Sequence, residues 1–520
     1  MSQQPRDDHR APAPDADIPD ETHLQGDEAY EDAAGYEAFE YDQAEGDEGY
    51  EDEAPPPALP PLVSLPSWRY GPDAWRWVRR ADRRYVDRIL RLRSGTALPA
   101  SLKARFGALG LPPEAVESTL REVRSVADWP HAWIRTAQRY LGDFRRQSSA
   151  SDEPAAAQAR YSAALCYHIA QIFVENDART VRLCRAATAS LFAQAQPHIA
   201  PSLRRLELPW RAGALPAYLA LPEAAQQGHR PTALVTLLNG VSTAKEETIA
   251  WAAPFLAVNL AVLAIDSPGT GEATKLGPYD ADHDDIADGV LEYAANEPLL
   301  DPRKVALLGI SLGGAQAIRC VAYDRRLLAA VTVTAPYQPT LWLHRASPLL
   351  LGQLAYLTGD PQTASAELAT GFDLTDTVDD VRCPVFVFGG ARDVIVPPTE
   401  SQRLAAAFGE LATLSWYPGG GHCLYEYLPA WTTEAATWLG AVAEARGEGE
   451  GWSTRVDAAA AGAFARERLE DFFQPLPGAE APQVQESGEY EEDPEALFAP
   501  EELDAPPERP SRPARDNRRG

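Results

Sequence analysis

The sequence predicts an α/β fold in which a mostly parallel β-sheet has helices on both faces and follows a helical segment. Short, fully apolar runs recur after residue 205, and segments of helical periodicity separate them. This alternation is typical of parallel strands that are buried on both faces. Residues 61–200 instead show helical spacing of apolar residues without any strand pattern. Hydrophobic residues make up 45% of the 520 residues, so the chain can form a large core.

The α/β part is predicted to begin with two strands, Leu206–Pro209 and Leu215–Leu221, around a turn at Ala212 and Gly213. The strands expected after them are Thr232–Leu238, Leu260–Ile265, Val305–Gly309, Ala329–Thr334, Val385–Gly389 and Thr413–Tyr417. The helices expected in the same region are Glu246–Val258, His283–Asn296, Leu312–Tyr323, Thr399–Phe408 and Tyr425–Arg446. Strands that alternate with helices in this way favour a parallel sheet.

The chain is expected to have an acidic, disordered tail at 1–60, a helical domain at 61–200 and an α/β domain at 201–446. A C-terminal helix and a second tail are expected over 447–520. Within the helical domain, the apolar periodicity predicts helices at Pro113–Val126, Trp133–Phe144, Ala155–Ile172 and Ala178–Ala195.

The acidic residues are concentrated in the two tails. Residues 1–57 contain 19 Asp and Glu against Arg6 and Arg10, and residues 475–504 contain 10 acidic residues and no basic ones. Such segments bury too little apolar surface to offset the entropy lost on ordering, so they favour a solubilising role. The alternative is that they dock a protein partner, through the tyrosines of a segment at 26–32 that recurs at 46–52.

The composition disfavours several classes of protein. The net charge of −29 comes almost entirely from the tails, and the near-neutral middle of the chain does not favour nucleic-acid binding. No run of apolar residues is long enough for a membrane span, and the first residues lack the pattern of a signal peptide. The five cysteines form no C-x-x-C pair, which favours a reducing compartment. We therefore expect a cytoplasmic protein that acts on a small molecule.

A G-x-S-x-G motif, Gly309-Ile310-Ser311-Leu312-Gly313, lies between an apolar strand and a helical pattern. This context predicts a sharp turn that exposes the Ser311 hydroxyl at the carboxyl edge of the sheet. Serine is a weak nucleophile and requires a base. His422 is the expected base, because it follows the strand Thr413–Tyr417 in a glycine-rich loop and precedes the last helix of the sheet domain.

Asp393 is the expected acid of the site. It follows the strand Val385–Gly389, whereas Asp376, Asp379 and Asp380 precede that strand and would lie at the opposite edge of the sheet. The order Ser, Asp, His along the chain is that of the α/β-hydrolase fold. Such a triad works without a metal or a cofactor, and neither is expected here.

Two backbone N–H groups are expected to stabilise the oxyanion that forms when a serine attacks a carbonyl. One is the N–H of Leu312, the residue after the nucleophile. The other should come from the loop after Thr232–Leu238, where Val241 is the first choice and Gly240 the second. The Asp266–Glu272 segment after the next strand is interpreted as a glycine turn that leads to a helix.

Several segments resemble the FrsA-like esterases, a group that includes 2,6-dihydroxypseudooxynicotine hydrolase and fungal polyketide-shortening hydrolases. The resemblance covers about residues 65–445 and is carried by Asn239–Glu247, Asp266–Glu272, Gly309–Gly314, the helix Tyr161–Gln171 and the strand Leu215–Leu219. It implies a helical cap over a serine hydrolase core, often as a homodimer. By position, it assigns the nucleophile, the acid and the base to Ser311, Asp393 and His422.

The bond that is cleaved stays open at this point. Some members of the group cleave carbon–carbon bonds, and an enolate leaving group benefits from an additional proton donor. Residues 336–359 contain no Asp or Glu, so an ester or thioester is favoured and a diketone is the alternative. The residues expected to contribute to a pocket for an aromatic or acyl substrate are Tyr337, Trp342, His344, Trp133 and His168. A non-catalytic scaffold that recruits partners through its tails is a further alternative.

Overall fold

The computed structural model describes residues 83–98, 100–174, 177–228, 230–346, 348–358, 364–447 and 451–472. The predicted acidic tail, the start of the helical segment at 61–82 and the predicted C-terminal tail lie outside the described residues. Residues up to Leu469 belong to one unit, and a second unit covers 470–520. The helices and the sheet described below lie in the first unit, apart from the last turn of the final helix.

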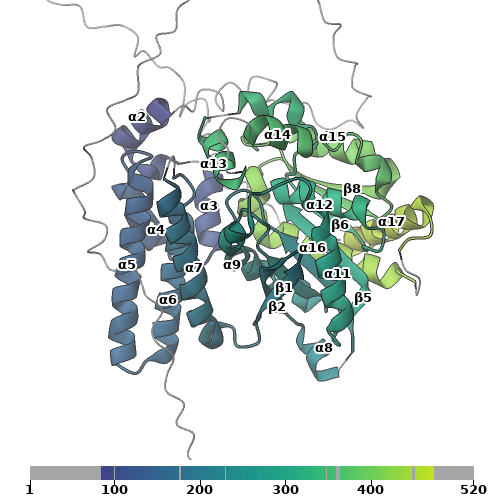
Figure 1. Cartoon of the computed structure of the whole chain (residues 1–520), viewed down its shortest axis with the longest axis horizontal. Coiled ribbons are helices and arrows are strands. Elements are labelled where there is room, and N and C mark those ends of the chain that lie inside the picture. Colours follow the sequence, from purple (N-terminus) through teal and green to yellow (C-terminus); the bar gives the residue numbers. More distant parts are fainter. Residues whose placement is uncertain are drawn as a thin grey trace, which may run out of the picture. The chain divides into compact units, whose positions relative to one another are not determined.

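An eight-stranded sheet forms the centre of the α/β part (Figure 1). Its strands are β1 (Arg204–Trp210), β2 (Gly213–Ala220), β3 (Thr232–Leu238), β4 (Ala261–Ile265), β5 (Leu300–Ile310), β6 (Ala330–Val333), β7 (Val385–Gly390) and β8 (Ala412–Tyr417). Their order in the sheet is β1-β2-β4-β3-β5-β6-β7-β8. The pairs β1–β2 and β2–β4 are antiparallel and all other pairs are parallel. This confirms the predicted, mostly parallel sheet.

Successive residues of the strands point into two different hydrophobic cores, one on each face of the sheet. In β5, Leu307 belongs to one core and Leu308 to the other, and Leu234 and Val235 divide in the same way in β3. Helices cover both cores, as the fully apolar strands predicted. One core also contains the buried side chains of the N-terminal helices. That face therefore joins the helical segment to the sheet.

The helices of the α/β part connect its strands and cover the sheet. They are α8 (Glu223–Gly228), α9 (Lys245–Thr248), α10 (Ala253–Ala257), α11 (Ile286–Asn296), α12 (Leu312–Tyr323), α13 (Pro348–Thr358), α14 (Ala364–Gly371), α15 (Pro398–Phe408), α16 (Leu428–Ala445) and α17 (Arg455–Phe472). Short 3₁₀ helices complete it: η4 (Ile249–Trp251), η5 (Gly271–Leu276), η6 (His283–Asp285), η7 (Pro339–Leu341), η8 (Leu343–Arg345), η9 (Val378–Asp380), η10 (Gly409–Leu411) and η11 (His422–Tyr427).

Two predicted helices are interrupted in the structure. The segment predicted as Glu246–Val258 divides into α9, η4 and α10. Pro254 lacks a backbone N–H and lies in the first turn of α10, where such a donor is not needed. The helix expected from Tyr425 begins instead at Leu428, because Cys423 and Leu424 have left-handed backbone conformations with φ of 60° and 52°. That irregular segment follows His422 directly and sets the direction in which the chain leaves the histidine.

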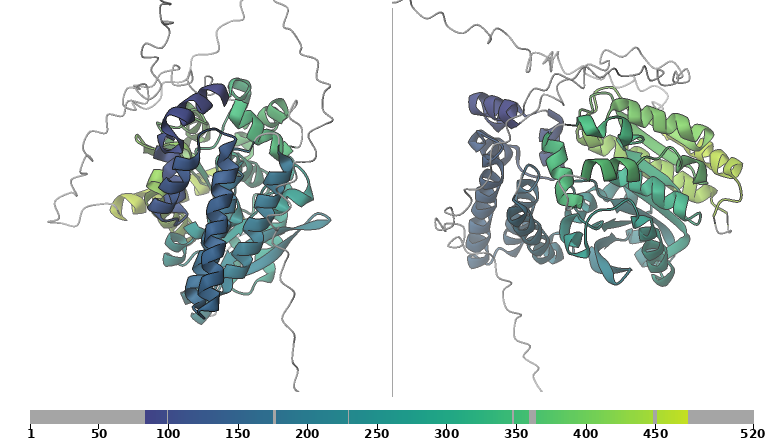
Figure 2. Two further views of the ribbon diagram at one scale, coloured as in Figure 1. Left: turned by 90° about the vertical axis from the view of Figure 1, so that its left-hand side faces the viewer. Right: turned by 45° about the horizontal axis from the view of Figure 1, so that its top comes forward.

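The N-terminal segment is helical throughout its described part, with α2 (Arg83–Arg93), η3 (Gly95–Ala97), α3 (Ala100–Ala108), α4 (Pro113–Glu122), α5 (Asp128–Ser149), α6 (Glu153–Ala170) and α7 (Ala178–Ile199). The long helices α5, α6 and α7 lie side by side (Figures 1 and 2). Asp152 and Asp177 accept hydrogen bonds from the first turns of α6 and α7, which stabilises these helix starts. The N-terminal helices pack on the α/β part: α3 contacts η11, and α7 contacts η5 and α9.

All five cysteines are free and buried. Cys166 and Cys184 lie on α6 and α7, Cys320 lies on α12, Cys383 precedes β7, and Cys423 follows His422. Burial raises the pKa of the Cys184, Cys320 and Cys383 thiols to about 12. None of the helices in the described ranges combines the length and the apolar composition that crossing a bilayer requires.

Candidate active site

Ser311 lies at the turn between β5 and α12, in the strained backbone conformation that the motif predicts. Its φ is 51° and its ψ is −125°, outside the regions that residues other than glycine usually occupy. Gly309 and Gly313 make the turn possible. A Cβ atom on Gly309 would lie 2.0 Å from the carbonyl oxygen of Gly313, and one on Gly313 would lie 2.5 Å from that of Leu238. The turn is therefore closed to any residue with a side chain at these two positions.

Ser311, His422 and Asp393 form a continuous hydrogen-bonded chain. The Ser311 Oγ lies 3.0 Å from His422 Nε2, and His422 Nδ1 lies 2.8 Å from Asp393 Oδ2. The other oxygen of Asp393 accepts the backbone N–H groups of Ile395 and Val396 at 2.8 and 3.0 Å. These two bonds fix the carboxylate, and the carboxylate in turn fixes the ring of His422.

The charge state of His422 depends on two opposing effects. Burial disfavours the imidazolium, but Asp393 beside it favours the imidazolium more strongly and raises the pKa of His422 well above 6.5. Thr334 lies beside the same ring. Its Oγ is 3.4 Å from His422 Nδ1 and accepts the backbone N–H of Cys423 at 3.0 Å. Thr334 thus ties the end of β6 to the loop that carries the histidine.

The three side chains come together because β5, β7 and β8 run in parallel and end at the same edge of the sheet. The loops after β7 and β8 also bind each other directly, since the Arg392 N–H donates to the carbonyl of Gly420 at 2.9 Å. A Cβ atom on Gly390 would lie 2.4 Å from the Gly420 oxygen. The glycines in these loops therefore allow the close approach that brings Asp393 to His422.

The loop after β3 runs beside the Ser311 turn. A Cβ atom on Gly240 would lie 3.2 Å from that of Ser311. The Gly240 N–H donates to the Thr243 hydroxyl at 2.8 Å, so it is already bound within the loop. Within the described residues, neither the Val241 N–H nor the Leu312 N–H has a hydrogen-bond partner. This arrangement favours the first choice for the oxyanion donors, Val241 and Leu312, over Gly240.

Asn239 and Asp266 stabilise the same loop through hydrogen bonds. The Asn239 amide donates to the Thr243 carbonyl and the Thr270 hydroxyl, at 3.1 and 2.9 Å, and its oxygen accepts the Ser267 N–H at 3.1 Å. Asp266 accepts the N–H groups of Lys245 and Glu272 at 2.8 and 2.9 Å. The Asp266–Glu272 segment is therefore more than a turn between elements. It supports the loop beside Ser311.

Comparison with known proteins gives a consistent picture. A family model described as the alpha/beta hydrolase family matches residues 237–435. The chain is 24% identical, over 60% of its length and 83% of the relative, to 2,6-dihydropseudooxynicotine hydrolase of Paenarthrobacter nicotinovorans. It is also 24% identical to esterase FrsA of Vibrio vulnificus, over 44% of its length and 52% of that esterase. The chain thus spans about half of the FrsA esterase.

A solved structure shares the fold of this chain. The crystal structure of 2,6-dihydroxy-pseudo-oxynicotine hydrolase superposes with a TM-score of 0.58 at 22% sequence identity, covering 68% of this chain and 99% of that one. The chain has the α/β-hydrolase fold, and its sequence is similar to hydrolases of the FrsA-like group. Its relatives are named as hydrolases and esterases, and the chain is a hydrolase.

Tyr337 and Trp342 of this α/β-hydrolase lie in the segment after β6, and Glu400 organises that segment. The buried Glu400 carboxylate accepts the N–H groups of Tyr337 and Gln338 and the indole N–H of Trp342, at 2.9, 2.6 and 3.0 Å. Arg403 pairs with the same carboxylate at 3.1 Å. Tyr337 and Trp342 are buried, whereas the third pocket candidate of this segment, His344, is exposed.

The two pocket candidates from the helical segment are fully buried. Trp133 lies in an aromatic cluster with Phe106 and Trp129, at ring-centroid distances of 5.2 and 5.8 Å. His168 lies 2.7 Å from Glu247 through Nε2 and 3.3 Å from the Gln171 amide through Nδ1. Both ring nitrogens of His168 are therefore bound to protein groups, and Trp133 packs inside the helical segment.

Three carboxylates of this α/β-hydrolase converge on one buried ammonium group. Lys245 Nζ lies 2.5 Å from Glu246, 2.9 Å from Asp266 and 2.9 Å from Glu272. Burial disfavours the charge of Lys245, but these carboxylates hold its pKa well above 10.5. Oxygen atoms of the three acids lie within 4.8 Å of one another, a spacing that suits a metal ion. The lysine supplies the positive charge at this position instead.

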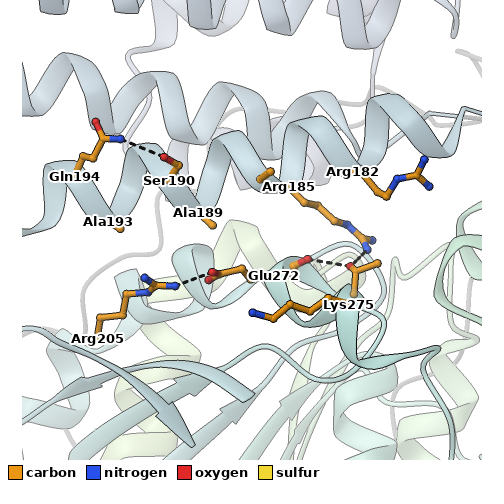
Figure 3. Close-up of a pocket in the computed structure, with 12 residues that line it drawn as sticks. Arg182, Arg185, Ala189, Ser190, Ala193, Gln194, Arg205, Glu272 and Lys275 are labelled. Carbon is orange, nitrogen blue, oxygen red and sulfur yellow. Dashed lines mark hydrogen bonds and ion pairs between the residues drawn. The ribbon is translucent and has the colours of Figure 1, made fainter. Parts of the chain in front are cut away.

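A cleft of about 640 Å³ lies between α7 and η5 (Figure 3). None of its lining residues belongs to the Ser311 site. Two of its cations bind the protein itself: Arg205 pairs with Glu272 at 2.6 Å, and Arg185 donates to the carbonyl of Gly269 at 2.9 Å and to the Thr274 hydroxyl. The cleft is therefore separate from the Ser311 site.

Proposed function

We propose that this α/β-hydrolase is a serine hydrolase that cleaves a small ester or thioester through an acyl-enzyme at Ser311. The observation that carries the proposal is the hydrogen-bonded chain from Ser311 Oγ through His422 to Asp393, at 3.0 and 2.8 Å. A strained turn holds the serine, and a carboxylate fixed by two backbone N–H groups holds the histidine. Groups held in this way need little reorganisation as charge develops.

The proposed reaction has two halves. His422 Nε2 accepts the Ser311 proton as Oγ attacks the carbonyl carbon, and Asp393 stabilises the imidazolium that forms. The Leu312 and Val241 N–H groups stabilise the oxyanion. The imidazolium then gives its proton to the leaving alcohol or thiol. Water, deprotonated by His422, attacks the acyl-enzyme. The imidazolium then returns this proton to Ser311 Oγ as the bond to the acyl group breaks, which releases the acid and the free enzyme.

Two observations support an ester or thioester over a carbon–carbon bond. Cleavage of a diketone requires a proton donor for the enolate. The His168 ring, which could approach from the helical side, is bound at both nitrogens. The carboxylate beside the segment after β6 belongs to Glu400, and it is bound to two backbone N–H groups and the Trp342 indole. An alcohol or thiol leaving group needs only the proton that His422 already holds.

We also propose that the helices over 83–199 act as a cap on this site, in line with the domain boundary expected near residue 200. Helix α3 packs against η11, the segment that begins with His422. A cap in this position would exclude water and select the substrate. The aromatic cluster of Phe106, Trp129 and Trp133 would then stabilise the cap, and residues nearer to η11 would line the pocket.

The first experiment replaces the proposed nucleophile. Ser311→Ala should abolish labelling by a fluorophosphonate probe and lower kcat/KM for accepted aryl esters by about 10⁴-fold or more. Ser267→Ala is a matched control, because Ser267 is also buried and its Oγ has no hydrogen-bond partner among the described residues. Labelling that persists in Ser311→Ala would refute the proposal.

The bond type is tested by comparing an aryl ester with an aryl 1,3-diketone of the same acyl group. We expect the ester to have the higher kcat/KM. His344→Ala and Tyr337→Phe should not change the ratio of the two rates. Faster cleavage of the diketone, lost selectively in either variant, would favour carbon–carbon hydrolysis instead.

A further inference from the structure

A helix of the N-terminal segment binds directly to the loop that carries the proposed oxyanion donor. Arg105 of α3 donates from one terminal nitrogen to the Ser242 hydroxyl at 3.0 Å, and from the other to the Ser242 carbonyl at 2.8 Å. Ser242 follows Val241, whose N–H is the proposed donor. The Arg105 guanidinium also lies over the ring of Tyr425, at 5.4 Å from its centroid. One side chain thus contacts the loop beside Ser311 and the segment after His422.

Glu247 holds Arg105 in this orientation. Its carboxylate accepts from Arg105 Nε at 2.9 Å and from a terminal nitrogen at 2.6 Å, which is the two-point geometry that an arginine offers a carboxylate. Both side chains are almost completely removed from solvent. Burial would raise the pKa of Glu247, but Arg105 and His168 lower it to about 2. The pair therefore stays charged, and Arg105 cannot rotate without leaving a buried carboxylate unpaired.

A chain of hydrogen bonds supports the Arg105–Glu247 pair, and the donor and the acceptor of each bond can be assigned. Arg185 can only donate, so the Gln171 oxygen faces it at 2.8 Å and the Gln171 amide nitrogen faces His168 Nδ1. His168 Nδ1 is therefore an acceptor, and Nε2 donates its proton to Glu247 at 2.7 Å. We call the side chains Arg105, Glu247, His168, Gln171 and Arg185 the Arg105–Glu247 network. It runs from α7 through α6 and α9 to α3.

We infer that Arg105 is a positioning residue for the hydrolysis proposed above: it holds the Val241 N–H in place for the oxyanion. The inference rests on that proposed function. Val241 lies beyond the end of β3, so the hydrogen bonds of that strand do not fix its position. An oxyanion donor must lie about 2.7–3.1 Å from the oxyanion to be effective. Arg105 binds both the backbone and the side chain of the residue next to that donor. The cap thereby becomes part of the catalytic apparatus and is not only a wall of the pocket.

The test compares Arg105→Met with the unmodified full-length protein. Losing an oxyanion donor costs about 10²–10³ in kcat, so displacing one should lower kcat by roughly 10- to 100-fold. KM should change little, because the ground-state carbonyl depends less on this donor. The rate of fluorophosphonate labelling should fall with kcat, since its phosphonyl oxygen needs the same N–H groups. Millimolar guanidinium should restore part of kcat in Arg105→Met.

Two further variants separate positioning from folding. Arg105→Met leaves the Glu247 carboxylate without its arginine partner, and a second change, Glu247→Gln, removes this carboxylate. The double variant should fold but keep the low kcat of Arg105→Met. Arg139→Met is the matched control. It removes an arginine of the same helical segment that, among the described residues, binds Glu122 and Thr136, and its kcat should be normal.

The outcomes distinguish the two proposals. If the unmodified protein and Ser311→Ala label equally, the proposed function fails. If labelling depends on Ser311, but folded Arg105→Met keeps its kcat or loses activity through KM alone, only the positioning role is refuted.

Discussion

At the scale of single residues, the site depends on one side chain whose charge is set by two opposing effects. The His422 ring is partly buried, with 16% of its side chain exposed, and this burial alone would favour the neutral ring. The Asp393 carboxylate at 2.8 Å reverses this preference. A base for the Ser311 proton must be neutral before the reaction and charged during it. The Asp393 carboxylate, which stabilises the charged ring during the reaction, therefore also sets the pH above which the ring is neutral and can act as a base.

This balance predicts the pH dependence. Because the pKa of His422 is raised above 6.5, kcat/KM should rise with pH and reach its plateau only on the alkaline side of that value. Asp393→Asn should move the inflection to lower pH and reduce kcat by about 10⁴-fold. Asp376→Asn should leave the profile unchanged, because Asp376 is exposed and precedes β7. A pH–rate profile of each variant with an aryl ester checks this, and a plateau already reached below pH 6 would contradict it.

At the scale of elements, local signals predicted most of the structure. The strands and the helix Leu312–Tyr323 follow from apolar runs and periodicity, and the G-x-S-x-G turn follows from the steric demands of its glycines. The irregular segments did not follow. Cys423 and Leu424 have left-handed backbone conformations, but neither is a glycine, so the sequence does not indicate these conformations. The Cys423 N–H donates to the hydroxyl of Thr334, which comes from a distant part of the chain.

The turn gives a prediction with an internal control. Gly309→Ala should prevent the elbow from forming, because its Cβ would lie 2.0 Å from the Gly313 oxygen and 2.5 Å from the Gly314 nitrogen. We expect insoluble or inactive protein. Gly107→Ala makes the same chemical change within helix α3, where nothing lies within 4 Å of the new methyl group. It should be active and more stable by up to about 1 kcal/mol. Thermal melts and ester assays of both variants measure the difference, and an active Gly309→Ala protein would contradict the geometry.

At the scale of the whole molecule, the helical segment and the sheet share a core and a polar network. The triad could be predicted because each member follows its own strand, and the order of the strands brings them together. The Arg105–Glu247 network could not. Arg105 and Glu247 are 142 positions apart, and neither lies in a pattern that indicates a partner. Only the packing of α3 on the α/β part brings them within hydrogen-bonding distance.

The network predicts how stability depends on pH. The pKa of Glu247 falls from 4.5 to about 2 on folding, a shift equivalent to about 3 kcal/mol of stability. A lowered carboxyl pKa stabilises the fold above pH 4.5, and this contribution is lost as the pH falls toward 2. Glu247→Gln should therefore lower the urea midpoint of unfolding at pH 7. The difference in this midpoint between the variant and the unmodified protein should become smaller below about pH 4. Urea titrations followed by tryptophan fluorescence test this. A difference that does not change with pH would show that the charge of Glu247 is unimportant.

The five buried thiols give the chain its own set of reporters. A buried cysteine is alkylated only while its surroundings are open, so the reaction rate at each one measures a local opening. Cys166 and Cys184 report on α6 and α7, whereas Cys320 and Cys383 report on the elements around the sheet. Cys423 adjoins His422. Mass spectrometry of the alkylated protein would thus distinguish two events. In one, only the helical segment opens while the sheet stays folded, and in the other the whole unit unfolds.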